Sequence, residues 1–517
     1  MYCHHHCSPS SSSSTSVIVA VAAASAANRN RDDEGEESCN WMCSFCGYLR
    51  YLLVFLGLLG CGMDYMLRYN ISVAIVAMVN NSATFSVNSS YACPAASNAS
   101  SDAQSSTGAG EYNWTPKEQG LVLGTFFWGY VITKAIGGRI AEILGPTFTV
   151  SLTLGLCSIL SFLTPTIADV HPLALAFLRL LMGLLQGPIF PAIYSIISRW
   201  TLPGETTTMI SASMSGASLG ALVALGLSGI VIKSFGWRWV FWGSGIVTLA
   251  WLPFWVLYVR DSPCNHPGIS KKELHRLSKN HNQLRKKVPW SRIFKSKYVY
   301  LFMMMEFVNV WTQTIMISEG PTFLTNQVGI RLDDASKLNT ILTVLAQFLI
   351  IFYGWLSDFL ERREWLSMLT VRRLFQMFGT LVMVGCLMGL AFAGCDAFEV
   401  AVYFIVLVIG LPITIVTYII GPMIIAPNYA GTLTGMMGLG TIGGFLLPLF
   451  VSLFMDKKNG WMTVFLVSAA INLVTGVIYV IWMPNEEEEW NMYEEIPESD
   501  KDGMKKNGKM KGGTLTQ

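Results

Sequence analysis

The chain has 517 residues, of which 52% are hydrophobic and only 13% are charged, and its mean hydropathy is +0.46. A soluble domain carries about 25% charged residues, so this composition excludes a soluble protein and predicts an integral protein of the lipid bilayer. The formal net charge of +2 does not indicate nucleic acid as a partner. The sequence contains no zinc-ligand spacing, phosphate-binding loop or nucleophile elbow, so we expect no enzyme activity, no cofactor and no metal site.

Residues 1–47 contain a poly-serine run and predict a disordered cytoplasmic tail. The first predicted span runs from Tyr48 to Val79, which exceeds the about 20 apolar residues needed to cross a bilayer. Residues 80–118 then form a polar loop with four N-glycosylation sequons, at Asn80, Asn88, Asn98 and Asn113. Four sequons in one loop indicate that it faces the lumen or the cell exterior, which places the N-terminus in the cytoplasm.

Five further spans complete the first half of the chain, within residues 48–259. They are predicted at about Gln119–Arg139, Thr147–Ala168, Leu173–Ile197, Ile210–Ile232 and Trp239–Val259. Gly187, Pro188 and Pro191 are expected to break or kink the fourth of the six helices. Residues 260–297 are polar, and after Arg260 they hold ten lysines and arginines against Asp261 and Glu273. A basic segment of this kind predicts a cytoplasmic linker, and within it Ser270–Ser278 predicts a short amphipathic helix.

The second half, residues 298–483, also contains six predicted spans. Its spans are predicted at about Tyr298–Phe323, Leu338–Leu356, Val371–Ala393, Ala397–Ile420, Thr432–Met455 and Trp461–Met483. Residues 484–517 predict a second disordered cytoplasmic tail. The expected fold is therefore an all-α membrane protein with twelve transmembrane helices in two pseudo-symmetric six-helix bundles, an arrangement in which transporters place their substrate at mid-membrane between the halves.

The two halves also share a local pattern. Gly138 precedes Glu142 by four residues at the end of the second span, and Gly354 precedes Asp358 in the same way at the end of the eighth. A tight glycine turn and an acid near a helix N-terminus are suited to a latch that closes a gate. We therefore predict that these four residues form gating contacts at the cytoplasmic rim.

Charged residues inside spans mark candidate functional sites, because each one costs roughly 2.5–3.5 kcal/mol on insertion scales. Arg68, in the first span, either faces an anion pathway, or it snorkels to a headgroup or pairs with Asp64 one turn earlier. Asp64, Glu306 and Glu319 are the candidate sites for a coupling ion, Na⁺ or H⁺. Each of these acids could equally neutralise a nearby arginine or lie at a helix end.

Several motifs in consecutive order resemble one branch of the major facilitator superfamily. They are RYNISVAIVAMVN at Arg68–Asn80, GTFFWGYVITKAIGGRIAE at Gly124–Glu142, RLLMGLLQGPIFPAIYSIISRW at Arg179–Trp200, HPGISKKE at His266–Glu273 and APNYAGTLTG at Ala426–Gly435. The branch is the anion/cation symporter family, which includes type I sodium–phosphate cotransporters, sialin and vesicular glutamate transporters. The match extends from about Tyr48 to Met483, and the insect-type inorganic phosphate cotransporters are the most similar in character.

The resemblance implies roles for particular residues. Arg68 matches the first-helix arginine of the family and Arg179 its fourth-helix arginine, and both are taken to line the anion path. Two guanidinium groups there would clamp a phosphate or a carboxylate. The alternative for Arg179 is a helix-end residue paired with a headgroup.

This chain departs from the family pattern at three further candidate substrate-binding positions. Vesicular members and sialin have a glutamate where this chain has Gln186, which cannot titrate. The seventh-helix arginine position of vesicular members falls near Asn309. Lys134 replaces a family glutamine, and either adds positive charge to the path or snorkels to the cytoplasmic surface. These departures favour a plasma-membrane cotransporter over a vesicular glutamate transporter.

The function expected from these observations is secondary active symport of a small anion, inorganic phosphate or an organic anion, coupled to Na⁺ or H⁺ by alternating access. The sequence shows no nucleotide-binding loop, so ATP is not expected to drive transport directly. Two alternatives remain: an uncoupled anion facilitator or channel, which the loss of an acid at Gln186 favours, and a vesicular transporter of an organic anion such as glutamate or sialic acid.

Overall fold

We describe a computed structural model of the chain over residues 49–79, 110–202, 204–269, 271–278, 288–330, 332–363, 367–394, 396–454 and 460–492. Expectations for the two chain ends, residues 1–48 and 493–517, lie outside these residues. So do the sequons at Asn80, Asn88 and Asn98, whereas Asn113 is described and exposed.

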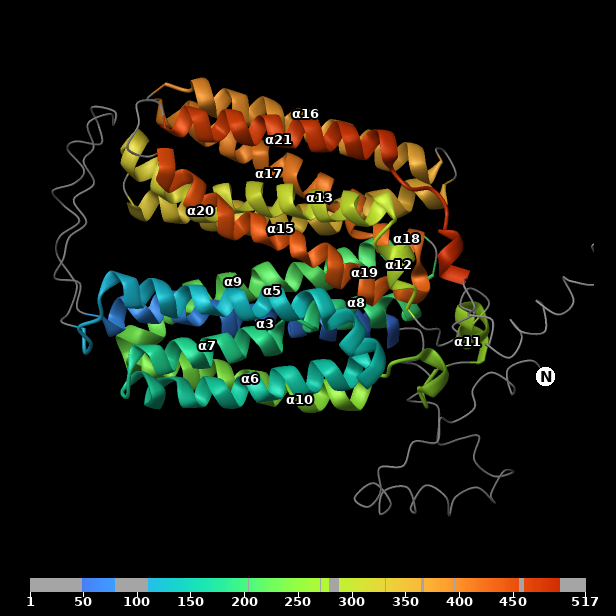
Figure 1. Ribbon diagram of the computed structural model, residues 1–517, viewed down its shortest axis with the longest axis horizontal. Coiled ribbons are helices and arrows are strands. Elements are labelled where there is room, and N and C mark those ends of the chain that lie inside the picture. The colour runs from blue at the N-terminus through green and yellow to red at the C-terminus, as the bar shows by residue number, and fades with distance from the viewer. Residues whose placement is uncertain are drawn as a thin grey trace, which may run out of the picture.

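The first half folds into six transmembrane passages, drawn from blue to yellow-green in Figure 1. They are α3 (Leu49–Met78), α5 (Pro116–Leu144), α6 (Pro146–Ala168), α7 and α8 (Pro172–Gln186 and Ile189–Trp200), α9 (Thr206–Phe235) and α10 (Arg238–Tyr258). The fourth passage breaks between α7 and α8 as predicted, at Gly187 and Pro188. This break lies against α5, where an added Cβ at Gly187 would lie 2.2 Å from Oγ1 of Thr133.

The second half repeats the arrangement, and Figure 1 shows its helices grouped beside the first bundle. Its passages are α13 to η4 (Lys297–Val328), α15 (Leu332–Arg362), α16 (Met368–Phe392), α17 and α18 (Ala397–Ile419 and Gly421–Ile425), η5 to α20 (Pro427–Phe454) and α21 (Gly460–Trp482). The described residues hold eleven helical segments long and apolar enough to cross a membrane. The seventh passage completes the twelve that the sequence predicts.

The seventh passage differs from the single helix expected over Tyr298–Phe323. It consists of α13 (Lys297–Thr314), the π-helical turn η3 (Ile315–Glu319), α14 (Gly320–Phe323) and a second π-helical turn, η4 (Leu324–Val328). Pro321 has no backbone N–H to donate to the carbonyl of Ile317, so a regular α-helix cannot continue through this region. Glu319, a candidate for the coupling ion, lies half-buried in η3.

The segment between the halves contains η2 (Pro263–Asn265), the expected short helix α11 (Lys271–Ser278) and α12 (Trp290–Ile293). We call the end of the bundles next to α11 and α12 the linker end, and the end next to Asn113 the sequon end; Figure 1 shows α11 and α12 together at one end. Within the linker, His266 packs against Trp200 with ring centroids 5.7 Å apart. Burial lowers the pKa of His266, because an imidazolium loses hydration there.

The prediction that the chain is disordered from residue 484 is wrong for its first residues. Residues 484–492 end in the 3₁₀ turn η7 (Glu489–Met492), and Trp490 is buried with its ring 6.1 Å from that of Tyr429. Asn491 also accepts a hydrogen bond from the backbone N–H of Asn428. The acidic composition suggested a solvated tail, whereas Trp490 and Asn491 supply the apolar surface and hydrogen bonds that hold the segment in place.

The topology leads to a glycosylation experiment. Replacing Asn80, Asn88, Asn98 and Asn113 together by glutamine is expected to remove the mobility shift that peptide-N-glycosidase produces on the protein from eukaryotic cells, because all four sequons lie in one loop. Restoring each asparagine alone shows which sequons are used. An absence of glycan on the wild-type protein would contradict placement of the sequon end outside the cytoplasm.

Candidate functional site

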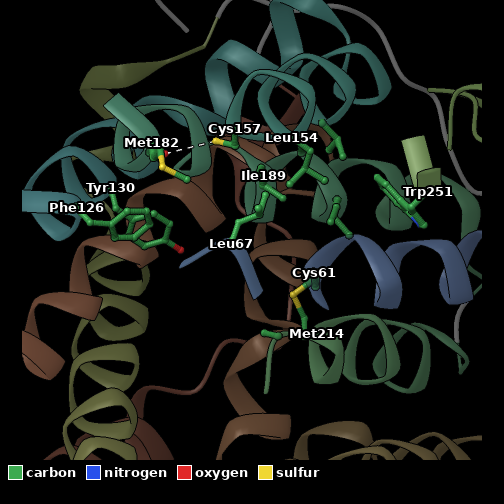
Figure 2. Packing of buried hydrophobic residues seen from close by; sticks show 14 of the residues in the cluster. Cys61, Leu67, Phe126, Tyr130, Leu154, Cys157, Met182, Ile189, Met214 and Trp251 are labelled. Atoms are coloured by element: carbon green, nitrogen blue, oxygen red, sulfur yellow. Dashed lines mark hydrogen bonds between the residues drawn. The ribbon is translucent and has the colours of Figure 1, made fainter. Parts of the chain in front are cut away.

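Arg68 lies on α3 inside a box of aromatic rings. Its Cζ is 4.1 Å from the ring centroid of Tyr130, 4.3 Å from that of Tyr65 and 5.1 Å from that of Phe126. Figure 2 shows the rings of Phe126 and Tyr130, which belong to α5, lying side by side near Leu67 of α3. The electron-rich ring faces stabilise a guanidinium group, so α5 holds the arginine inside the bundle.

Arg68 is also paired with an acid. Its Nη2 donates to Oδ2 of Asp64 at 3.1 Å, and the side chains are 5% and 0% exposed. Arg68 is therefore not a headgroup anchor. Nε of Arg68 and Oδ1 of Asp64 have no hydrogen-bond partner among the described residues. Buried polar atoms in proteins are nearly always paired, so this pair has capacity to bind a further polar group.

Arg179, on α7, lies against the ring of Phe126, which Arg68 also contacts. Its Cζ is 5.0 Å from the centroid of Phe126. Its Nη2 donates to the carbonyl of Arg68 at 2.7 Å, and its Nη1 donates to the carbonyl of Leu67 at 3.4 Å. In this conformation both terminal nitrogens are used to hold α3 rather than forming a clamp with Arg68, and the headgroup alternative is wrong because Arg179 is 2% exposed.

Gln186 follows Arg179 by two turns on α7 and is fully buried. Its amide nitrogen and oxygen both lack a hydrogen-bond partner among the described residues. Cys157 of α6 lies nearby and donates to the carbonyl of Met182, the contact drawn as a dashed line in Figure 2. The uncharged amide of Gln186, which interacts with the side chain of Cys157, can bind a polar ligand or water but cannot carry a proton.

Lys134, which is buried, and Glu306, which is partly buried, form an ion pair between the two halves. Nζ of Lys134 on α5 is 3.6 Å from Oε1 of Glu306 on α13, and the side chains are 8% and 14% exposed. Oε2 of Glu306 accepts a hydrogen bond from the hydroxyl of Tyr418 at 2.8 Å. The alternative in which Lys134 snorkels to the surface is therefore wrong.

Asn309, one turn after Glu306 on α13, lies inside the second bundle. Its Nδ2 donates to the carbonyl of Met305 at 2.9 Å, and its Oδ1 accepts from Oγ1 of Thr414 at 2.8 Å. The bond from Thr414 joins α13 to α17, whereas the bond to Met305 lies within α13. Together they use the polar atoms that a ligand would need. In this conformation Asn309 holds two helices together, and its role in substrate binding stays a prediction.

The Gly–acid pattern forms two equivalent contacts at the linker end. Oε1 of Glu142 on α5 accepts from the backbone N–H of Thr432 at 3.1 Å and from its Oγ1 at 2.8 Å, at the start of α19 (Ala430–Met437). Oδ2 of Asp358 on α15 accepts from the N–H and Oγ1 of Thr208, at the start of α9, at 2.7 and 2.6 Å. Each acid thus caps a helix of the opposite half.

The two glycines make these contacts possible. An added Cβ at Gly138 would lie 2.0 Å from the carbonyl oxygen of Gly431, and one at Gly354 would lie 2.9 Å from Oγ of Ser211, again across the halves. Arg362 adds a hydrogen bond to the carbonyl of Gly204 at 2.8 Å. The linker end is therefore closed in this conformation.

Sequence reasoning missed one buried arginine. Arg372, on α16, is 4% exposed and its Nη2 donates to the carbonyl of Thr417 at 2.9 Å. The same carbonyl accepts from the hydroxyl of Tyr479 at 3.0 Å. The signal was available, because Arg372 falls inside the span predicted at Val371–Ala393, but its position at the beginning of that span did not suggest burial.

A family model described as the Major Facilitator Superfamily matches residues 54–446. The chain belongs to the major facilitator superfamily. It is 33% identical to human sialin over 453 residues, which cover 86% of this chain and 91% of sialin. It is 29% identical to vesicular glutamate transporter 3 of Danio rerio over 453 residues, covering 85% and 74% of the two chains. The resemblance to the anion/cation symporter branch is thereby confirmed.

Solved structures of this superfamily have the same fold. A proton:xylose symporter matches with a TM-score of 0.60 at 12% identity, covering 85% of this chain and 97% of that one. The Escherichia coli fucose:proton symporter matches with a TM-score of 0.56 at 13% identity, covering 84% and 99%. At these identities the likeness shows the fold alone, and it agrees with two six-helix bundles of the major facilitator type.

The predicted gating role of Glu142 and Asp358 can be tested by a distance measurement. Glu142→Gln and Asp358→Asn each weaken a charge-assisted hydrogen bond, which is worth about 1.5–3 kcal/mol, so the linker end is expected to open more often. Spin labels at the exposed Cys264 and at Lys295→Cys, with the other cysteines replaced, report this as longer distances. A Glu399→Gln variant, far from the gate, is the control, and unchanged distances in both gate variants would contradict the assignment.

Proposed function

We propose that the protein is a secondary active transporter that moves a small anion across the membrane by alternating access, coupled to H⁺ or Na⁺. The observation that carries the proposal is the buried Arg68–Asp64 pair with hydrogen-bonding atoms left unpartnered. An anion that leaves water needs compensating charge and hydrogen bonds, and a guanidinium group held among aromatic rings provides both. Asp64 would balance that charge in the empty site.

The gating contacts support alternating access. Glu142 and Asp358 cap helices of the opposite half at the linker end, which we place in the cytoplasm because of its basic residues. Breaking both contacts and rocking the halves apart would expose the same central site to the cytoplasm. The conformation described here then corresponds to a carrier closed on its cytoplasmic side.

The relatives and the site both support an anion as the substrate. Sialin and vesicular glutamate transporters are the similar proteins, which supports an organic anion, and a guanidinium group binds phosphate equally well. Gln186 has no titratable group at the position where the resemblance expects an acid. That difference supports a plasma-membrane cotransporter of inorganic phosphate or an organic anion over a vesicular carrier, and it keeps an uncoupled facilitator as the second candidate.

The test is uptake into proteoliposomes that contain the purified protein. Radiolabelled inorganic phosphate, L-glutamate and sialic acid are each supplied with an imposed Na⁺ gradient, an imposed pH gradient or neither. A coupled carrier accumulates at least one anion above its external concentration under one gradient, whereas a facilitator only equilibrates it. Absence of uptake for all three anions in folded protein would overturn the proposal.

A further inference from the structure

We propose that Lys134 and Glu306 form a proton-operated switch, in which a proton bound to Glu306 releases the Lys134 ammonium group to bind the transported anion. The inference rests on the proposed function. It identifies H⁺ as the coupling ion and Lys134 as a second ligand of the anion beside Arg68. The pair joins α5 of the first half to α13 of the second half at 3.6 Å. Any ligand that separates these groups therefore acts on the contact between the two halves.

The surrounding backbone fits the side chains of this pair closely. The turn η6 (Gly438–Thr441) runs past both of them. An added Cβ at Gly438 would lie 2.3 Å from Cε of Lys134, and one at Gly440 would lie 2.8 Å from Cβ of Glu306. These glycines leave room for the two charged side chains, so the sequence of η6 allows the ion pair to form between the two halves.

The ammonium group of Lys134 and the carboxylate of Glu306 together carry no net charge. A proton added to the carboxylate gives the pair a net positive charge. If Glu306 gains a proton, Lys134 loses its ion-pair partner in a largely buried site. Asp64 of α3 also interacts electrostatically with Lys134, but its carboxylate is already paired with Arg68. The unpaired ammonium group is therefore costly until an anion arrives. If an anion approaches first, it meets the Glu306 carboxylate and is repelled. One proton and one negative charge therefore bind together, and the proton adds to a carboxylate oxygen without any other bond being broken.

The other titratable groups that face Glu306 do not offer an alternative binding site for the proton. Tyr418 of α17 donates its hydroxyl to Oε2, and Tyr194 of α8 lies near enough to interact electrostatically with Glu306 while its hydroxyl donates to the carbonyl of Ile419. The turn η6 and helix α19, with the sequences GLGT and AGTLTGMM, contribute no titratable side chain. Lys134 is thus the cation that the carboxylate balances.

The atoms around Glu306 favour a proton over Na⁺. A hard metal cation binds where several oxygen atoms converge. Here one carboxylate oxygen faces an ammonium group and the other accepts from a hydroxyl. Within the part of the chain that the structure describes, no group of three or more His, Cys, Asp and Glu side chains is placed to hold a metal ion. A proton needs only the carboxylate itself.

The transport test uses phosphate, L-glutamate and sialic acid as probes in proteoliposomes. For one proton carried with each singly charged anion, each unit of imposed pH difference is expected to give up to about tenfold accumulation in the wild type, since a pH unit corresponds to about a tenfold equilibrium ratio. Glu306→Gln should lower the ratio to near one while exchange of labelled anion for unlabelled anion continues. Lys134→Gln should raise the half-saturating anion concentration at least about tenfold by loss of the cation.

The matched control is Glu399→Gln, which neutralises an exposed glutamate at the sequon end of α17. This variant should accumulate anion as the wild type does. Accumulation driven by the pH gradient in Glu306→Gln would overturn the switch, and so would accumulation in the wild type that follows a Na⁺ gradient and ignores the pH gradient.

A second measurement separates failure of the switch from failure of the proposed function. Hydrogen–deuterium exchange of residues 130–138 and 302–310, corrected for the intrinsic pH dependence, is followed between pH 4.5 and 8 without any anion. The wild type should change from a protected to a less protected form as the pH falls, and Glu306→Gln should stay in the less protected form throughout. Identical profiles in the two proteins would overturn the switch even if all three anions fail to enter the vesicles.

Discussion

Replacing Arg68 with alanine is expected to lower anion uptake at least about 100-fold. The guanidinium group supplies charge-assisted hydrogen bonds of about 1.5–3 kcal/mol each, and two such bonds to a buried anion exceed the 2.7 kcal/mol that corresponds to about 100-fold. Arg68→Lys should retain charge but lose the planar fork, so uptake should persist with a higher half-saturating concentration. Both variants are measured as initial uptake rates in proteoliposomes.

Removal of Arg68 alone also leaves Asp64 buried without its partner, which can destabilise the protein for a reason unrelated to transport. The double variant Arg68→Ala with Asp64→Asn removes that buried charge. We expect it to unfold at nearly the wild-type temperature and still to transport poorly. Wild-type uptake by either protein would show that Arg68 acts only as a structural residue of α3.

Replacing Gly138 with alanine is expected to abolish transport by holding the linker end open. The added methyl group would lie 2.0 Å from the carbonyl oxygen of Gly431, and overpacking of this kind costs about 1–3 kcal/mol. The closed conformation should therefore become about 5- to 150-fold less populated. Spin labels at Cys264 and Lys295→Cys should report longer distances than in the wild type.

The control for this experiment is Gly124→Ala on the same helix. An added Cβ at Gly124 has no neighbouring atom within 4 Å, so alanine there should improve helix propensity slightly and leave transport unchanged. Equal transport by Gly138→Ala and Gly124→Ala would mean that α5 and α19 do not need their close contact during the cycle.

Much of the fold could be predicted from hydrophobic runs and charge, because a bilayer imposes the length and polarity of each span. The seventh passage was harder to predict, since the effect of Pro321 on the helix depends on how the carbonyl of Ile317, which loses its usual donor, is accommodated. Here that carbonyl accepts a hydrogen bond from Nδ2 of Asn339, on the next passage, at 3.3 Å. The sequence offered the Arg68–Asp64 ion pair as one alternative for Arg68, because side chains four residues apart lie on the same face of a helix. In contrast, Glu142 and Thr432 are 290 residues apart, and no local pattern pairs them.

The ion pair of Lys134 and Glu306 could not be predicted for the same reason, since no local sequence pattern pairs residues so far apart. Each residue was visible as a charge inside a span, but with different suggested roles, and only the packing of α5 against α13 brings them together. The glycine and acid of each contact at the linker end were singled out because the pattern occurs twice, and their gating role stays a prediction. Their threonine partners could not be predicted, because a threonine at the beginning of a helix is common and its contact depends on the opposite half.

The packed residues 484–492 set a practical limit on how far the protein can be shortened. The backbone N–H of Glu488 donates to the carbonyl of Ile425 at 2.9 Å, and Trp490 covers Tyr429, only three residues before Thr432. A deletion that begins after Met483 strips this cover from the segment leading to α19, whereas one that begins after Met492 keeps it. Affinity tags and fluorescent fusions intended to leave the contact between Glu142 and Thr432 undisturbed therefore belong beyond Met492.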